Sequence, residues 1–253
     1  MIYLKHKNHT FKVATMWSEI KLWQWLALQK AGDDQVRIIA ILTGLTEEVV
    51  KRLSQRSLAI IAYATIFLST KFNVKDWIVP TQLKLGDYTI NPKIDIKEKE
   101  YGQKVILTDA VVSKSGLINN ISTICEVYIQ CLITKKFYDP EKTQEIKTLI
   151  DKDITLCDAY AIAMDYEEQL GKLLDNEAKT LNKPPTQDEL RAGVAMYNDF
   201  GIMNTIRILA GGDILKVDEV LRKDYNTVYL WLLMKKTDAV FGEQYNNVLK
   251  NKR

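Results

Sequence analysis

Helix-start signals recur at short intervals along this chain, and they limit the folds open to it more than any other feature of the sequence. Such a signal is a side chain that can cap a helix, followed by apolar residues at helical spacing. Gly32, Gly44 and the Gly211-Gly212 pair supply matching helix ends. The pattern predicts a mainly α protein, with a compact helical body built from helices joined by short turns. In chain order, the predicted starts lie at Ser18, Asp33 with Asp34, Thr46, Ser57, Asp139 before Pro140, Thr155 and Thr186.

Two stretches alternate between apolar and polar residues and predict strands instead. Residues 1–13 alternate around a polar turn, which indicates a short N-terminal hairpin. In LKLGDYTI, residues 83–90, two alternating runs flank Gly86-Asp87, a two-residue loop that favours an antiparallel hairpin. The segment IDI, residues 94–96, is a candidate third strand. KEKEYGQK, residues 97–104, is expected to be exposed loop. The predicted class is therefore mainly α with a small β insert, or α+β.

The same signals predict three segments along the chain. Residues 1–72 would form the hairpin and a cluster of short helices, and residues 73–107 the small β insert, with its antiparallel sheet near 75–107. Residues 108–253 would form a helical domain. In it, the dipeptide Pro-Pro within NKPP indicates a linker near 182–186, ahead of a helix through LRAGVAMYNDF.

Charge, cysteine content and hydropathy argue against several classes of protein. The 253 residues carry 35 Lys and Arg against 32 Asp and Glu, a net charge of +3. That balance is too even to predict bulk attraction to nucleic acid or to an anionic membrane. Cys125, Cys131 and Cys157 lie in apolar helical surroundings without a C-x-x-C pair, which favours a reducing compartment. No signal-peptide pattern opens the sequence, and the longest apolar run, residues 58–68, is too short to span a bilayer. We expect that run to be a buried helix in a protein of cytosolic type.

Residues that carry chemistry are sparse and poorly placed. The chain has only two histidines, His6 and His9, and both lie in one turn. No Cys or His lies at zinc spacing with partners. The same shortage of histidines leaves Ser-His or Cys-His catalysis without a plausible general base. The glycine pair in LAGGDIL follows a helix, whereas a phosphate cradle precedes one. The acidic segment DKDITLCD, residues 151–158, lacks the glycine and glutamate of a calcium loop. We therefore predict no catalytic, cofactor-binding or metal site, no cofactor and no small-molecule substrate. An enzyme with an unrecognised site is the alternative.

Large aromatic residues cluster in two places and predict contacts instead of chemistry. MWSEIKLWQWLAL, residues 16–28, puts three tryptophans on more than one side of a helix. VYLWLLM, residues 228–234, makes every side of a long final helix apolar, starting from about Thr227. Both patterns fit a helix buried in the core, and both fit a subunit interface, where Trp and Tyr contribute most to binding. The interface candidates are Trp17, Trp23, Trp25, Tyr229, Trp231 and Phe241.

Several segments together resemble proteins of tailed bacteriophages. MWSEIKLWQWLAL followed by IIAILTGLTEEVVKRL resembles the N-terminal pattern of phage tail assembly chaperones, in which a W-x-E-I helix precedes an LTGL-x-E-E helix. With LGDYTINP, YDPEKTQEIKTLIDKDITLCDAYAIAMDY and GGDILKVDEVLRKDYNTVYLWLL, the series is similar to tail- and neck-region proteins, those of the crAss-like phages included. The likeness covers most of the chain, but it consists of spacings of apolar and turn residues without a catalytic signature.

The resemblance implies a non-enzymatic virion protein, a ring or connector-type subunit of the neck or tail that is assembled in the host cytoplasm. Its partners would be further copies of itself in a ring, together with other neck, tail or portal proteins. Nucleic acid would only pass through the lumen of the ring, and no membrane would be involved. The same resemblance also fits a tail assembly chaperone that is absent from the mature virion. A ring needs two different apolar patches on each subunit, and the two aromatic clusters are the candidates.

Overall fold

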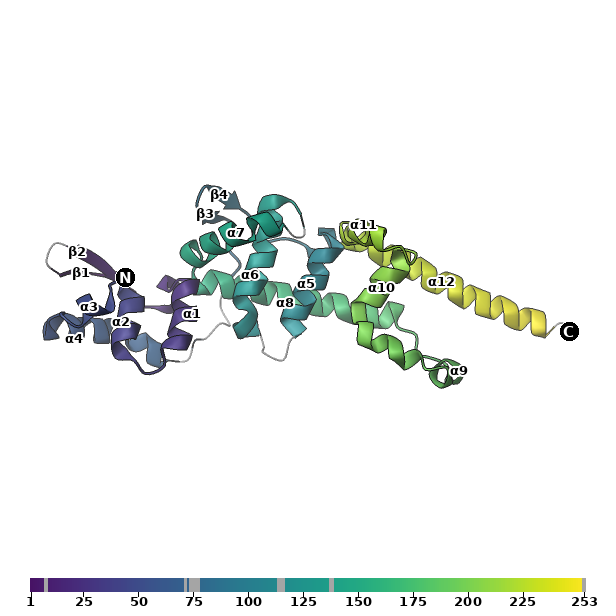
Figure 1. Cartoon of the computed structure of the whole chain (residues 1–253), viewed down its shortest axis with the longest axis horizontal. Coiled ribbons are helices and arrows are strands. Elements are labelled where there is room, and N and C mark those ends of the chain that lie inside the picture. Colours follow the sequence, from purple (N-terminus) through teal and green to yellow (C-terminus); the bar gives the residue numbers. More distant parts are fainter. Residues whose placement is uncertain (7–8, 71, 73–77, 113–116, 137–138, 252–253) are drawn as a thin grey trace.

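The helices are arranged along one long axis, with the N-terminal elements at one end and the last helix running out at the other (Figure 1). This computed structural model describes residues 1–6, 9–70, 72, 78–112, 117–136 and 139–251. Within these ranges the chain forms helices and two antiparallel sheets of two strands each, so the expected mainly α class with a small β part is confirmed. The division into three segments remains a prediction; its boundary at residue 107 lies inside one helix, and residues 73–77 lie outside the described ranges.

The N-terminal cluster begins with the predicted hairpin. Strand β1 pairs antiparallel with β2 from Ile2 opposite Val13 to His6 opposite His9. The predicted caps at Asp34 and Thr46 are confirmed, because the Asp34 side chain accepts a hydrogen bond from Arg37 N–H and the Thr46 side chain accepts one from Val49 N–H. The elements are β1 (Ile2–His6), β2 (His9–Val13), η1 (Trp17–Glu19), α1 (Leu22–Ala31), α2 (Gln35–Thr43), α3 (Glu47–Val50), α4 (Gln55–Ala64) and η2 (Ile66–Ser69).

Two predicted starts in this cluster are wrong. Ser18 lies within the short 3-10 helix η1, because the chain then extends so that Ile20 accepts a backbone hydrogen bond from Leu156. Helix α1 begins only after Lys21, whose N–H donates to the Gln24 side chain. The start of α4 is capped by Ser54, not by Ser57, which lies in its first turn and donates its N–H to the Ser54 hydroxyl.

The buried helix expected over residues 58–68 is also wrong. Helix α4 ends at Ala64, and of its residues only Ile61 and Ala64 are buried. Tyr63 is 77% exposed and Ile66 is 66% exposed. The cluster lies at one end of the molecule (Figure 1), so α4 packs on one side only, against the small second core made with the hairpin.

The predicted hairpin around Gly86-Asp87 is confirmed by the antiparallel pair β3 (Leu83–Leu85) and β4 (Tyr88–Ile90). Gly86 has a φ of +53°, a conformation that glycine adopts without strain. Its N–H donates to Asp153 Oδ2 over 2.8 Å, which holds the turn against the C-terminal end of helix α7 (Pro140–Asp153).

The third strand expected after this hairpin is wrong, and the exposed loop expected over residues 97–104 is wrong beyond residue 98, since only residues 97 and 98 are exposed. Residues 94–96 form no strand, because Gln169 donates to the Ile94 carbonyl and accepts from the Ile96 N–H, after which η3 (Ile96–Glu98) begins. Residues 101–104 already belong to a helix and are buried. The Lys104 side chain is only 5% exposed, because its ammonium pairs with Glu177 inside the body.

The body of the molecule consists of α5 (Tyr101–Val112), α6 (Leu117–Thr134), α7 (Pro140–Asp153) and α8 (Leu156–Leu181). The predicted starts of α7 and α8 are confirmed, since Asp139 accepts from Glu141 N–H and Thr155 from Asp158 N–H. Buried apolar residues of α6 and α8 form the centre of the core. Each such side chain contributes about 1.5–3 kcal/mol on burial. Helix α8 runs from the N-terminal cluster to the base of the last helix (Figure 1).

The C-terminal part begins with an extended segment over residues 182–186, where a linker was predicted. The capping box of Thr186 and Glu189 is confirmed, but the helix expected through LRAGVAMYNDF breaks at Gly193, whose φ is +84°. Helix α10 ends ahead of Gly211 and Gly212, as predicted. The elements are α9 (Gln187–Arg191), η4 (Val194–Phe200), α10 (Gly201–Leu209), η5 (Ile214–Lys216), α11 (Val217–Leu221) and α12 (Tyr225–Lys250).

Candidate protein-interaction surface

Two of the N-terminal interface candidates lie within an aromatic cluster of this chain. The Trp17 ring meets Trp25 and Phe67 edge to face, with centroids 5.8 and 5.2 Å apart. Phe72 packs against Trp17 at 5.3 Å and against Tyr160 of α8 at 5.5 Å. Trp17 and Trp25 are therefore partly buried against the core. Their large rings tie α1 to α8, and a role in binding a partner stays a prediction.

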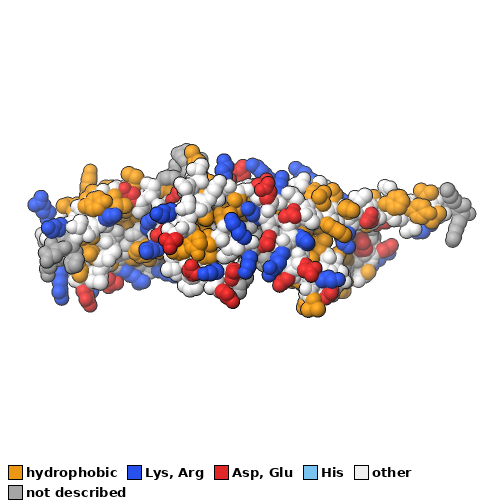
Figure 2. Space-filling model, turned by 90° about the horizontal axis from the view of Figure 1, so that it is seen from above, with side chains coloured by type: hydrophobic (Ala, Val, Ile, Leu, Met, Phe, Trp, Pro, Cys, Tyr) orange, Lys and Arg blue, Asp and Glu red, His pale blue; other side chains and the backbone are white. Residues whose placement is uncertain are grey.

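Exposed apolar side chains are concentrated instead in the part of the chain beyond residue 186, and Figure 2 shows them along the narrow end formed by α12. Among the described residues of this part, the buried apolar ones are only Ile206, Ala210, Tyr225 and Val228. Of the remaining interface candidates, Trp23 is 38% exposed, and Tyr229 is half-buried. Large exposed apolar residues of this part are Leu190, Met196, Tyr197, Phe200, Met203, Ile208, Ile214, Leu215, Leu230, Trp231, Met234, Phe241, Tyr245, Val248 and Leu249.

Helix α12, called the arm below, is fixed at its base by backbone pairing with the start of α5. Tyr101 N–H donates to the Lys223 carbonyl over 2.7 Å, and Tyr225 N–H donates to the Lys99 carbonyl over 2.9 Å. The arm begins at Asp224, whose Oδ1 accepts from Thr227 N–H over 2.8 Å. These two backbone hydrogen bonds hold the start of the arm against the segment that leads into α5, and they fix the direction in which the arm leaves the body.

A buried ion pair and stacked tyrosines strengthen the same joint. Lys104 Nζ lies 3.2 Å from Glu177 Oε2 and 5.6 Å from the centre of the Tyr101 ring. The rings of Tyr101, Tyr225 and Tyr229 stack in turn, with centroids 6.5 and 5.9 Å apart. Burial, together with the Glu177 carboxylate, raises the pKa of the Tyr101 and Tyr225 hydroxyls above the usual range, so both stay neutral.

One face of the arm lies against the end of α8. Tyr229 donates its hydroxyl to Thr180 Oγ1 over 2.9 Å, and Lys236 Nζ donates to the carbonyls of Thr180 and Asn182 over 2.7 and 3.2 Å. Further out, Lys183 forms an ion pair with Glu243. These contacts occupy the inner face of the helix and leave its outer face free.

The outer face carries a single apolar stripe. At 3.6 residues per turn, its seven large apolar side chains fall within an arc of about 100°. Each is between 44% and 66% exposed, and the rings of Phe241 and Tyr245 stack with centroids 6.0 Å apart. Asp238 lies within the same arc. The members of this arm stripe are Leu230, Trp231, Met234, Phe241, Tyr245, Val248 and Leu249. The core alternative for VYLWLLM is therefore wrong for Leu230, Trp231 and Met234.

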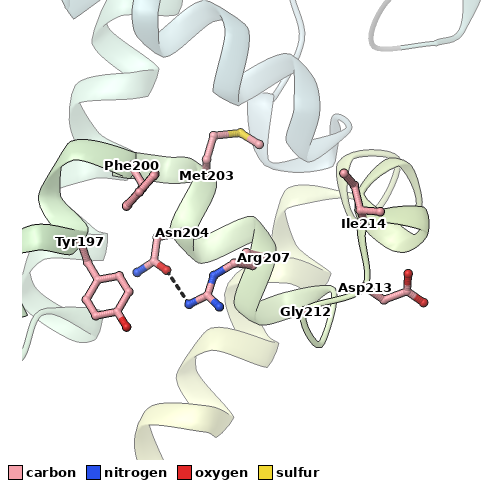
Figure 3. A pocket seen from close by; sticks show the side chains of 8 residues that line it. All are labelled: Tyr197, Phe200, Met203, Asn204, Arg207, Gly212, Asp213 and Ile214. Atoms are coloured by element: carbon pink, nitrogen blue, oxygen red, sulfur yellow. Dashed lines mark hydrogen bonds between the residues drawn. The ribbon is translucent and has the colours of Figure 1, made fainter.

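A second apolar feature, called the α10 hollow below, lies between η4, α10 and the turn that follows α10 (Figure 3). It has a volume of about 530 Å³. In the middle of its lining, Arg207 Nη2 donates to Asn204 Oδ1 over 3.1 Å. The other lining residues are Tyr197, Phe200, Met203, Gly212, Asp213 and Ile214.

The described cysteines, and the two carboxyl groups of α6 and α7 whose pKa is raised, lie outside the lining of the α10 hollow. Burial raises the pKa of the Cys125, Cys131 and Cys157 thiols to about 12, which keeps them protonated and poorly nucleophilic. Burial also raises the pKa of Glu126 and of Asp151, and neither lines the α10 hollow. In the part of the chain that the structure covers, no group of three or more His, Cys, Asp or Glu side chains is placed to hold a metal ion.

Comparisons with known proteins assign this chain to no family. No family model matches the sequence, and neither the curated proteins nor the solved structures contain a match. Of the helices in the described ranges, none has both the length and the apolar character needed to cross a bilayer.

Proposed function

We propose that this chain is a non-enzymatic structural subunit of the neck or tail of a tailed bacteriophage, of the ring or connector type. It would assemble in the host cytoplasm and remain in the virion, in contact with further copies of itself and with other neck, tail or portal proteins. The observation that carries the proposal is the pair of exposed apolar surfaces, the arm stripe and the α10 hollow.

Exposed apolar area of this kind supports a role in assembly because an isolated soluble protein keeps such area small. Contiguous apolar patches mark sites of contact with other macromolecules. A ring is built from heterologous contacts, in which one surface of a subunit meets a different surface of the next. The arm stripe and the α10 hollow are two such surfaces. The arm stripe includes Trp231 and Phe241 from the C-terminal cluster expected from the sequence, whereas the α10 hollow takes the place of the N-terminal cluster.

The rigid base of the arm supports a permanent role over a transient one. The Lys104–Glu177 pair, the tyrosine stack and the backbone bonds to Lys99 and Lys223 hold the arm in one direction before any partner binds. A surface held in its bound geometry loses less entropy on association. This favours a virion subunit over an assembly chaperone that must later release its client.

Mass spectrometry of gradient-purified particles of the phage that encodes this chain tests the proposal. We expect the chain in finished particles at a copy number comparable with that of other neck subunits. Its presence in the infected-cell lysate but absence from particles would overturn the proposal in favour of the chaperone. Thermal stabilisation of the pure chain by one member of a metabolite panel would instead support the enzyme alternative, because a ligand that binds only the folded state raises its melting temperature.

A further inference from the structure

We propose that the arm stripe of one copy of this chain docks into the α10 hollow of a neighbouring copy, with Asp238 of the arm paired to Arg207 in the hollow. The inference rests on the proposed function and names the contact that joins successive subunits. The occupant of the hollow is thus the outer face of a second copy's α12, bound as a helix in an apolar groove.

The area of the arm stripe matches what one partner contributes to a stable interface. A large aromatic side chain buries about 150–250 Å² when fully covered, and these seven residues are 44–66% exposed. The three aromatic and four aliphatic side chains together expose on the order of 800 Å², which is about one partner's share of a standard interface. The hollow, with a volume of about 530 Å³, is too small to cover all seven. It would therefore take the middle of the stripe, Met234 and Phe241 on either side of Asp238, while the rest of the stripe lies along the surface beside it.

Each surface carries one charged side chain that forms no ion pair among the described residues, and the two are of opposite sign; the other charged residue of the hollow, Asp213, already pairs with Lys216 at 3.8 Å. Asp238 lies inside the apolar arc of the arm, and its carboxylate makes no hydrogen bond or ion pair with any described residue. Arg207 in the α10 hollow bonds to the Asn204 amide oxygen and, within the described ranges, to no carboxylate. A guanidinium forks readily onto a carboxylate, and such a pair inside an apolar contact fixes the register of the two surfaces.

The stripe cannot reach the hollow of its own chain. The arm is one uninterrupted helix from Tyr225 to Lys250, and Lys236 and Glu243 hold its inner face to the end of α8. Its outer part runs away from the body (Figure 1), and Phe241 and Tyr245 in this part are 66% and 54% exposed. The contact therefore joins different copies. Since the stripe and the hollow are different surfaces, each copy offers one of each and the contact repeats.

Two blocked variants test this arrangement by sedimentation velocity. The arm-blocked variant carries Met234→Asp and Phe241→Asp, and the hollow-blocked variant carries Phe200→Asp and Met203→Asp. All four side chains are exposed, so circular dichroism and melting temperature should stay those of the unaltered chain. We expect the unaltered chain to form species larger than a dimer, each variant alone to be monomeric, and their equimolar mixture to stop at a 1:1 dimer.

Other outcomes of this experiment overturn the inference. A hollow-blocked variant that still dimerises alone would show that arms pair with arms, and an arm-blocked variant that dimerises would show that hollows pair with hollows. An unaltered chain that stays monomeric at the highest soluble concentration would show that the two surfaces do not bind each other. If the chain is monomeric but present in purified particles, this contact is wrong and the proposed function is still supported. If the chain assembles as expected but is absent from particles, the proposed function is wrong and this contact is still supported.

A charge exchange tests the pairing of Asp238 with Arg207. We expect Asp238→Arg and Arg207→Asp each to weaken association by about tenfold or more, because each places like charges face to face in the contact. The double variant restores opposite charges and should recover most of the lost affinity. Weak association of the double variant, with its fold intact by circular dichroism, would overturn the pairing. As a matched control, Lys235→Glu changes a charge on the arm beside the stripe and should change association less than Asp238→Arg does.

Discussion

Helices α8 and α12 are both 26 residues long, yet the chain uses them in opposite ways. In α8, buried residues recur from Leu156 to Leu173, and neighbouring helices cover them on several sides. In α12, buried residues are confined to Tyr225 and Val228 in its first turn, Leu232 is only partly buried against the core, and the arm stripe is exposed. The comparison shows that an apolar helix face predicts contact with another apolar surface. Whether that surface belongs to the same chain depends on which elements the fold places beside the helix.

The contrast between α8 and α12 predicts that the same substitution has very different effects in the two helices. Leu170 of α8 is 1% exposed and Leu230 of α12 is 55% exposed. We expect Leu170→Ala to lower the free energy of unfolding by about 3–4 kcal/mol, through lost apolar burial and the cavity left behind. Leu230→Ala should change it by less than about 0.5 kcal/mol. Urea denaturation of dilute protein measures both. Equal losses would show that the stripe is buried within the single chain.

The joint between the two regions allows a second test with charged residues. Glu177→Gln removes the carboxylate partner of Lys104 and leaves an ammonium that is almost fully buried. We expect a loss of about 3 kcal/mol, because an unpaired buried charge is strongly destabilising. Glu243→Gln, which breaks the exposed pair with Lys183, is the control and should cost less than about 1 kcal/mol. Denaturation midpoints compare the two, and similar losses would contradict the special role of the buried pair.

The smallest expected effect concerns the first turn of the arm. Asp224→Ala removes the side-chain cap of α12 and should cost about 1 kcal/mol, with faster amide exchange in the first turn of the arm. The unchanged exchange of α8 amides serves as the internal control. If the first turn of the arm exchanges no faster in the variant, the cap does not hold that turn.

The same residue predicts a pH dependence. Hydrogen bonds from Thr227 hold the pKa of Asp224 below its usual value. A depressed folded-state pKa means that the contribution is present above the ordinary aspartate pKa and is lost as the pH falls through the lowered one. The stability difference between the unaltered chain and Asp224→Ala should therefore shrink in that acidic range. A difference that stays constant there would contradict the assignment.

Local hydrogen bonding explains which parts of the fold could be predicted from the sequence. The caps at Asp34, Thr46, Asp139 and Thr155 depend on side chains within three residues, so the sequence pattern was sufficient. Two of the failures have distant partners. The backbone of Ile20 pairs with a residue more than a hundred positions away, and Lys104 is buried only because Glu177 lies on another helix.

The candidate surface was predictable only in part, for the same reason. Trp231 and Phe241 were selected because aromatic residues dominate interfaces, and both are exposed on the arm. Phe200, Met203, Arg207 and Asp238 were missed. Their spacing resembles that of any amphipathic helix, and only their exposure in the folded chain singles them out.

The contacts spaced along the inner face of the arm make it a strut. Tyr225, Tyr229, Lys236 and Glu243 are all held to the rest of the chain, so only the last seven residues, about 11 Å of helix, project beyond these contacts. If neighbouring copies join through the arm as proposed, the body of each subunit sets the angle between them, and we expect rings of a single diameter.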